Sequence, residues 1–306
     1  AFGVDVGGTT VKMGFFTTAG ELLEKWEIPT RTQDEGAHVL PDIAEAVAGK
    51  MKEKGIDKHD VEGIGIGVPG PVCDHGVVYK CVNLGWGVFN VEYALGHMTG
   101  LKVKAGNDAN VAALGEMWKG GGRGHRNIIM ITLGTGVGGG IIINEKILAG
   151  TNGAAGEIGH MPVKEDETDT CGCGKKGCLE QYASATGIVR MTKKYLAAHP
   201  EEASVLAGNI TAKDIFDAAK AGDPVALKMV DELGRMLGTA AASLACAINP
   251  EAFVIGGGVA RAGAILMDAV EKYFHKNAFH ASANTRFIPA ELGNDAGIYG
   301  CVKMVI

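Results

Sequence analysis

The stretch FGVDVGGTTVKMGFF, residues 2–16, decides the fold. It predicts a strand, a tight turn at Gly7-Gly8-Thr9-Thr10 and a second strand. The stretch IIMITLGTGVGGGIII, residues 128–143, repeats this order, with Gly134-Thr135-Gly136 as the turn. Two similar units in one chain predict two related domains, which we expect to face each other across a cleft.

The remaining segments alternate between strand and helix patterns. Apolar residues at a spacing of four in residues 35–54 predict a helix, which Gly55 ends. Further strands are expected at residues 24–28, 61–68, 102–105 and 252–255, and further helices at residues 108–118, 215–221, 225–248 and 297–306. This alternation indicates an α/β fold. The glycine-rich run at residues 120–124 is typical of a hinge or a domain boundary.

The composition of the chain excludes several classes of protein. With 306 residues, 46% of them hydrophobic, it has enough apolar surface for a packed core and a length typical of about two domains. The net charge is −6 and no long basic run occurs, so nucleic acid is not an expected partner. Residues 127–144 are uncharged, but their glycines fit strand–turn–strand better than a membrane span. No secretory signal precedes the first strand, which predicts a cytoplasmic protein.

The glycine-rich turns resemble phosphate-binding motifs. The G-x-x-x-x-G-K-[ST] pattern of P-loop proteins does not occur. Gly134-x-Gly136-x-x-Gly139 and Gly65-x-Gly67-x-x-Gly70 have the spacing of a dinucleotide fingerprint, but neither leads into the helix that would hold a pyrophosphate. A dehydrogenase is therefore not favoured. Turns of Gly and Thr still suit phosphate, because successive N–H groups form an anion-binding nest; the alternative is a pair of plain hairpin turns.

A cluster of thiols predicts a metal site. Cys171, Cys173 and Cys178 lie within one glycine-rich loop, and His160 lies eleven residues upstream of the first. Structural zinc favours four nitrogen and sulfur ligands, so the loop predicts three corners of a zinc site with His160 as the fourth. The alternative is a reduced surface loop, whose clustered thiols would be open to oxidation. The seven cysteines are an odd number, and no disulfide framework is expected.

Several motifs occur in the order found in one family. They are Asp5-x-Gly7-Gly8-Thr9, Asn107-Asp108-Ala109-Asn110, the turn at residues 133–140, Gly156-Glu157-Ile158-Gly159-His160 and the cysteine loop through Leu179-Glu180. Together they resemble the ROK family of repressors and sugar kinases over nearly the whole chain, and residues 82–86 and 180–187 resemble its bacterial glucokinase branch. The resemblance implies an actin-like, ribonuclease H-like ATPase fold with two related domains around a cleft. It divides the chain into residues 1–118, completed by the helix at 297–306, and a larger domain at 119–296 that carries the zinc loop.

The resemblance also implies an activity, which is the ATP-dependent phosphorylation of glucose at the 6-hydroxyl. The alternatives are a kinase for an N-acylhexosamine, mannose or fructose, or a non-catalytic sugar-sensing protein. Repressors of the family carry an N-terminal helix-turn-helix domain, and only Ala1 precedes the first strand here. The implied cofactors are ATP, Mg²⁺ and a structural Zn²⁺, and the implied assembly is a homo-oligomer, a dimer by resemblance.

The roles of single residues follow from the same resemblance. Asp108 is the expected catalytic base, although a carboxylate there is also suited to capping a helix, which Asn107 could do instead. The expected sugar-binding residues are Gly70, Asn83, Asn107, Asp108, Glu157, His160 and Glu180. The expected nucleotide-binding residues are Asp5, Gly7, Gly8, Thr9, Thr10, Lys12, Gly134, Thr135, Gly136, Gly256, Gly257 and Gly258. The expected metal ligands are His160, Cys171, Cys173 and Cys178.

Two of these roles stay open at the level of sequence. Many members of the family carry Lys where this chain has Thr10, and Lys12 lies on the same face of the strand, so either residue is a candidate to meet the phosphates. Asp5 is expected to reach Mg²⁺ through water, because hard cations favour carboxylates and keep bound waters. The alternative for Asp5 is a buried aspartate at a strand end that is satisfied by backbone N–H groups.

Overall fold

The structure is a computed structural model that describes residues 1–73 and 75–306. The chain forms two compact units. Unit 1 comprises Ala1–Arg126, Gly140–Gly156 and Glu291–Ile306, and unit 2 comprises Asn127–Gly139 and Glu157–Ala290. None of the helices in the described residues combines the length and the hydropathy that a membrane crossing needs. The predicted division into one domain at residues 1–118, completed by residues 297–306, and another at residues 119–296 stays a prediction.

Unit 1 is built on a five-stranded sheet with the order β3-β2-β1-β4-β7. Its strands are β1 (Phe2–Val6), β2 (Thr10–Phe16), β3 (Leu22–Pro29), β4 (Ile64–Val68) and β7 (Val103–Asn107). The first three strands are antiparallel, and β1, β4 and β7 are parallel. The turn between β1 and β2 closes where Gly7 N donates to Thr10 O at 3.0 Å, so the predicted strand–turn–strand unit is confirmed. A small ladder joins β5 (Val77–Val78) to β6 (Phe89–Asn90).

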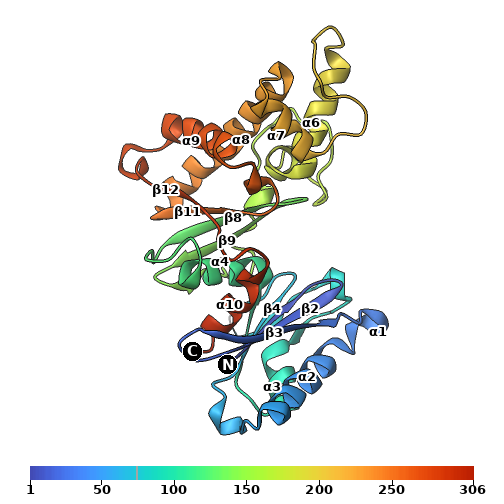
Figure 1. Cartoon of the computed structure of the whole chain (residues 1–306), viewed down its shortest axis with the longest axis vertical. Coiled ribbons are helices and arrows are strands. Elements are labelled where there is room, and N and C mark those ends of the chain that lie inside the picture. The colour runs from blue at the N-terminus through green and yellow to red at the C-terminus, as the bar shows by residue number, and fades with distance from the viewer. Residues whose placement is uncertain (74) are drawn as a thin grey trace. The chain divides into compact units, whose positions relative to one another are not determined.

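Helices cover both faces of this sheet (Figure 1). They are α1 (Gln33–Gly36), α2 (Val39–Lys54), α3 (Val91–Thr99), α4 (Asp108–Lys119) and α10 (Ala296–Lys303). The apolar face of α2 packs into the core formed by β1 and β4. On the other face α10 lies directly on the strand backbone, because a Cβ atom at Gly65 would be only 1.7 Å from Cys301 O.

One predicted boundary in unit 1 is wrong. We expected the helix of residues 35–54 to begin at Glu35, but α2 begins at Val39. Asp34 and Glu35 have φ of 52° and 56°, which is left-handed and breaks the helix there. The predicted end is confirmed, because α2 ends at Gly55 with φ of 65°.

The second five-stranded sheet has the order β10-β9-β8-β11-β12. Its strands are β8 (Ile128–Leu133), β9 (Val137–Ile143), β10 (Lys146–Ile147), β11 (Ala252–Gly256) and β12 (Arg286–Pro289). As in the first sheet, an antiparallel edge pair, β10 and β9, is followed by a central strand, β8, that is parallel to the next two, β11 and β12. The chain enters unit 1 within β9. The repeated order of strands supports the duplication that the two glycine turns predict.

The helices of unit 2 surround a long central helix. They are α5 (Glu180–Ala183), α6 (Ala185–Ala198), α7 (Ala212–Lys220), α8 (Pro224–Ile248) and α9 (Ala264–Asn277). Asp223 caps α8 and Pro224 is its first residue, a combination that favours helix initiation. One-turn 3₁₀ helices complete the chain: η1 (Lys58–Asp60), η2 (Val82–Leu84), η3 (Ile158–His160), η4 (Val259–Ala262), η5 (His280–Ser282) and η6 (Gly293–Asp295).

Candidate functional site

The start of α4 holds the predicted catalytic residue in unit 1. Asn107 caps the helix, because its Oδ1 accepts from Asn110 N at 3.1 Å, and its Nδ2 donates to Gly70 O at 3.1 Å. Asp108 follows as the first helical residue, and its Oδ1 accepts from Ala109 N at 2.8 Å. The positive end of the helix dipole stabilises a carboxylate at this position. Asn107 therefore takes the capping role, and Gly70, Asn107 and Asp108 are brought together.

A second carboxylate, Asp5, lies on β1 near Asp108. Burial raises the pKa of Asp5 to about 6, Lys12 opposes the rise, and the negative charge of Asp108 adds to it. Lys12 is the register partner of Asp5 across the hairpin, and its Nζ donates to Asn294 O at 3.3 Å. Two carboxylates that repel each other are a donor set that suits a hard cation such as Mg²⁺.

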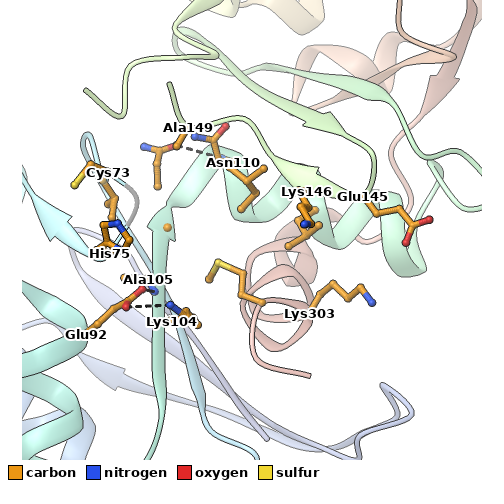
Figure 2. A pocket seen from close by; sticks show the side chains of 16 residues that line it. Cys73, His75, Glu92, Lys104, Ala105, Asn110, Glu145, Lys146, Ala149 and Lys303 are labelled. Atoms are coloured by element: carbon orange, nitrogen blue, oxygen red, sulfur yellow. Dashed lines mark hydrogen bonds and ion pairs between the residues drawn. The ribbon is translucent and has the colours of Figure 1, made fainter. Parts of the chain in front are cut away.

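A pocket of about 480 Å³ lies in unit 1 beside the edge strand β7 (Figure 2). Asn107 and Asn110 line it from the start of α4. Glu92 Oε1 accepts from Ala105 N at 3.0 Å, and Glu92 Oε2 accepts from Lys104 Nζ at 3.3 Å, so Glu92 covers part of the strand edge. Asp108 is not among the described residues that line this pocket. The pocket is therefore a neighbour of the predicted sugar site rather than the site itself.

In unit 2 the predicted nucleotide-binding glycines converge at the end of β8. The turn after β8 closes where Gly134 N donates to Gly136 O at 3.0 Å. Gly257, directly after β11, lies against the same strand end with φ of 87°, and a Cβ there would be 2.5 Å from Leu133 O. Only glycine allows both this φ and this approach. Gly256 is also the register partner of Thr132.

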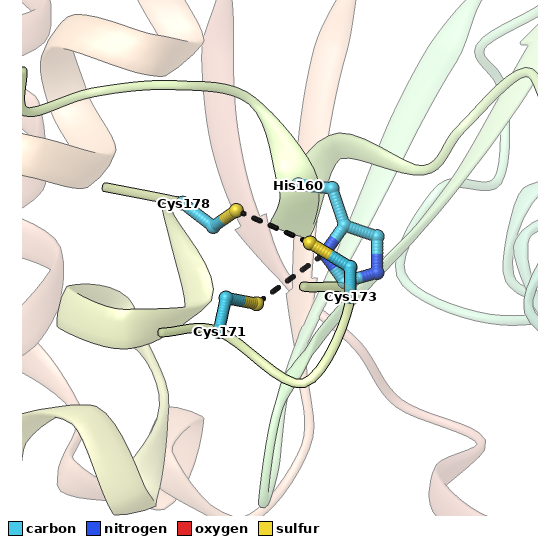
Figure 3. A group of neighbouring side chains, drawn as sticks. All are labelled: His160, Cys171, Cys173 and Cys178. Atoms are coloured by element: carbon cyan, nitrogen blue, oxygen red, sulfur yellow. Dashed lines mark hydrogen bonds between the residues drawn. The ribbon is translucent and has the colours of Figure 1, made fainter. Parts of the chain in front are cut away.

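The four predicted metal ligands of unit 2 point toward one another (Figure 3). The ligand atoms of His160, Cys171, Cys173 and Cys178 all lie within 4.8 Å of one another. The Sγ atoms of Cys173 and Cys178 are 3.6 Å apart, and Cys171 Sγ is 3.8 Å from His160 Nδ1. Four ligands at about 2.0–2.3 Å from a tetrahedral ion are about 3.3–3.8 Å apart, so these side chains fit zinc.

The cluster of predicted metal ligands adjoins the predicted sugar carboxylates. Cys171 Sγ donates to Glu180 Oε1 at 2.9 Å, and His160 Nδ1 is 3.7 Å from the same oxygen. Glu157 directly precedes η3, and its carbonyl oxygen accepts from His160 N at 3.1 Å. A metal ion bound by these ligands would coordinate His160 and restrict the movement of the neighbouring Glu180. Asn83, by contrast, is exposed on η2, and its role stays a prediction.

A partly buried polar network holds the cysteine loop, and no sequence pattern predicted this network. Arg190 on α6 donates to Asp169 Oδ2 at 2.6 Å and to Glu167 Oε2 at 2.7 Å. Burial alone would raise the pKa of Glu167, but hydrogen bonds from Arg190 and Tyr182 bring it well below its usual range. Gln181 joins the network to the loop, because its Nε2 donates to Asp169 O and its Oε1 accepts from Cys178 N, both at 3.0 Å.

Comparisons with known proteins agree with this arrangement. The ROK family model matches residues 1–306. The chain is 50% identical over 304 residues to a glucokinase from Halalkalibacterium halodurans, covering 97% of this chain and 92% of that protein. It is 39% identical over 314 residues to a glucokinase from Streptomyces coelicolor, covering 99% and 96%. The crystal structure of a ROK family glucokinase from Streptomyces griseus in complex with glucose and AMPPNP superposes with a TM-score of 0.75 at 39% identity, over 100% of this chain and 98% of that one.

Proposed function

Because the chain belongs to the ROK family, we propose that it transfers the γ-phosphate of ATP to the 6-hydroxyl of glucose, with Asp108 as the base. The family match supports an α/β fold of the actin-like ATPase type, and the glucokinase relatives support the activity of an ATP-dependent glucose kinase. The observation that carries the proposal is the near-complete match to a glucokinase at 50% identity. The roles of single residues, which follow, are inferences from the geometry.

Asp108 would accept the proton of the attacking hydroxyl. Phosphoryl transfer needs positioning, charge stabilisation and a group that receives this proton. Asp108 is the first residue of a capped helix, so its backbone is fixed, and the hydrogen bond from Ala109 N orients its carboxylate. Asn107, anchored to Gly70 O, would hold the sugar beside it.

Glu157, His160 and Glu180 would contribute the sugar contacts from unit 2. Charged acceptors bind hydroxyl groups through short, strong hydrogen bonds, which makes them sensitive to the arrangement of hydroxyls on a ring. Glu180 is half-buried, and its Oε1 lies 3.7 Å from His160 Nδ1, beside the proposed zinc ligands. Specificity for glucose would follow from the positions of these few acceptors.

The nucleotide would be bound by the two glycine turns, residues 7–10 and 134–136, and by Gly256 to Gly258. Bound Mg²⁺ would neutralise phosphate charge, and the Asp5 carboxylate is its candidate holder. Bound Zn²⁺ would order the loop of residues 171–178 and the adjoining Glu180, as a structural ion that orients a binding residue. We also infer a homodimer by family resemblance, which light scattering after gel filtration tests.

A coupled assay tests the proposed function. Purified enzyme is incubated with MgATP and each of glucose, mannose, fructose, N-acetylglucosamine and N-acetylmannosamine, and ADP release is followed. We expect kcat/KM to be greatest for glucose, and the product to be glucose 6-phosphate. A greater kcat/KM for another hexose would show that this hexose, and not glucose, is the preferred substrate. No turnover with any of the five sugars would contradict kinase activity and favour a non-catalytic sugar-binding protein.

A further inference from the structure

The first turn of α6 is hydrogen-bonded to the phosphate turn that follows β8. Ala185 N donates to Gly134 O at 2.8 Å, and Thr186 Oγ1 donates to Thr135 O at 2.6 Å. Two successive carbonyl groups of the turn are thus directed toward α6. Both α6 residues lie within the segment 180–187 that resembles the glucokinase branch, but the resemblance assigns a role to neither of them.

The direction of these carbonyl groups fixes the direction of the donors. In a trans peptide, the N–H of the next residue points opposite to the C=O. With the carbonyls of Gly134 and Thr135 held by α6, the N–H groups of Thr135 and Gly136 point away from α6. Successive N–H groups with a common direction make an anion-binding nest. The α6 contacts therefore determine whether the turn presents donors or acceptors to a phosphate.

We propose that Thr186 is a positioning residue for the nucleotide, which acts by holding the Thr135 carbonyl so that the turn presents its N–H groups to the phosphates of ATP. The inference rests on the proposed function, because it takes the turn at residues 134–136 as the phosphate site. Thr186 itself touches no reacting atom in this account.

Further contacts tie this arrangement to the sugar side of unit 2. Ser184 is fully buried, its Oγ donates to Glu180 O at 2.6 Å, and it lies 3.1 Å from Thr186 Oγ1. On the other side, the Glu180 carboxylate lies close to Gly136, because a Cβ at Gly136 would be 2.6 Å from Glu180 Oε2. The turn is thus held between the start of α6 and the residue we expect to bind sugar.

The side chain of Thr186 is exposed, so a substitution there leaves the core of unit 2 intact. Thr186→Val keeps the volume of the side chain and removes only the hydroxyl that donates to Thr135 O. The net value of one hydrogen bond corresponds to a change in affinity of about 3- to 10-fold. We expect KM for ATP and Kd for the magnesium complex of AMPPNP to rise by this factor, while KM for glucose stays within about 2-fold of wild type.

Two further variants separate positioning from a merely structural effect. Thr186→Ser restores the hydroxyl, and we expect it to recover KM for ATP. Thr192→Val is the matched control, because buried Thr192 on the same helix also donates to a backbone carbonyl, Ile188 O, at 2.7 Å. It is expected to lower Tm and to leave both KM values unchanged.

The experiment measures KM for ATP and glucose, and Kd for the AMPPNP complex, for wild type and the three variants. A selective loss of nucleotide affinity in Thr186→Val that Thr186→Ser restores supports the proposal. Unchanged nucleotide affinity, an equal rise of both KM values, or failure of the Ser variant to restore affinity overturns it. Wild-type enzyme that binds AMPPNP but phosphorylates no hexose refutes the proposed function, while the comparison of Kd values still tests Thr186.

Discussion

Replacing Asp5 by asparagine should stabilise the protein in a pH-dependent manner. The carboxyl titrates at about 6 in the folded protein and at 3.8 in its unperturbed state, and the main cause is burial. Between these two pH values the folded state keeps a proton that the unfolded chain releases. The stability contributed by Asp5 therefore falls as the pH rises from about 4 to about 6 and then stays constant.

The size of the effect follows from this difference. About 2 pH units correspond to about 3 kcal/mol, of which about 2 kcal/mol develops between pH 4.5 and 7.5. Asparagine does not titrate, so the free energy of unfolding of Asp5→Asn relative to wild type should rise by about 2 kcal/mol between pH 4.5 and 7.5. At the roughly 2–4 °C per kcal/mol typical of units of 150–250 residues, the difference in Tm should grow by about 5 °C.

The assay is thermal unfolding of wild type and variant at several pH values between 4.5 and 7.5, without nucleotide. Asp42→Asn is the control, because the hydrogen bond from Arg31 lowers the pKa of Asp42 below its ordinary value, so Asp42 is ionised in both the folded and the unfolded chain above pH 4.5 and the Tm difference of this variant from wild type should stay constant over the interval. A Tm difference for Asp5→Asn that does not change with pH, or that shrinks as the pH rises, would refute the reasoning.

Two further predictions concern the metal and the Glu180 carboxylate. Metal analysis should find one zinc per chain, and Cys171→Ser should lose it while Cys246→Ser, an exposed cysteine on α8, keeps it; active protein with less than about a tenth of an equivalent would contradict this. Gly136→Ala should raise KM for glucose by about 10-fold or more, since its Cβ would lie 2.6 Å from Glu180 Oε2 and push away a charged hydrogen-bond acceptor. Gly49→Ala is the control, because a Cβ there meets no atom within 4 Å, and an unchanged KM for glucose in Gly136→Ala would contradict this prediction.

Local patterns predicted most of the fold because the strands and helices carry their own signals. The hairpin of residues 2–16 and its counterpart at 128–143 needed only β-forming residues around glycine turns. The start of α2 was placed too early although the apolar spacing begins only at Val39, and Gly36, whose φ is 70°, is the signal in the sequence that a helix does not run through residues 35–38. Helix α6 was not predicted, although Ser184 is a good cap for it.

The zinc ligands were predictable because three of them are close in sequence and share a distinctive chemistry. The supporting contacts were not, because they join residues that are far apart in the chain. Thr186 lies 51 positions from Thr135, and buried Glu116 accepts at 2.8 Å from Leu292 N, 176 positions away. A polar residue such as Thr186 or Glu116 shows no pattern in the sequence that identifies a distant hydrogen-bond partner.

Turnover by Asp108→Asn tests the central claim most directly. The variant should bind glucose with the wild-type Kd in calorimetry, while kcat for ATP-dependent formation of glucose 6-phosphate falls by about 10²- to 10⁴-fold, the usual cost of losing a general base. Asp223→Asn is the matched control, because Asp223 also stands at a helix start, where it accepts from Ala226 N at 2.9 Å, and its kcat should be unchanged. A kcat for Asp108→Asn equal to that of wild type would contradict the account and leave Asp108 as a residue that only stabilises the start of α4.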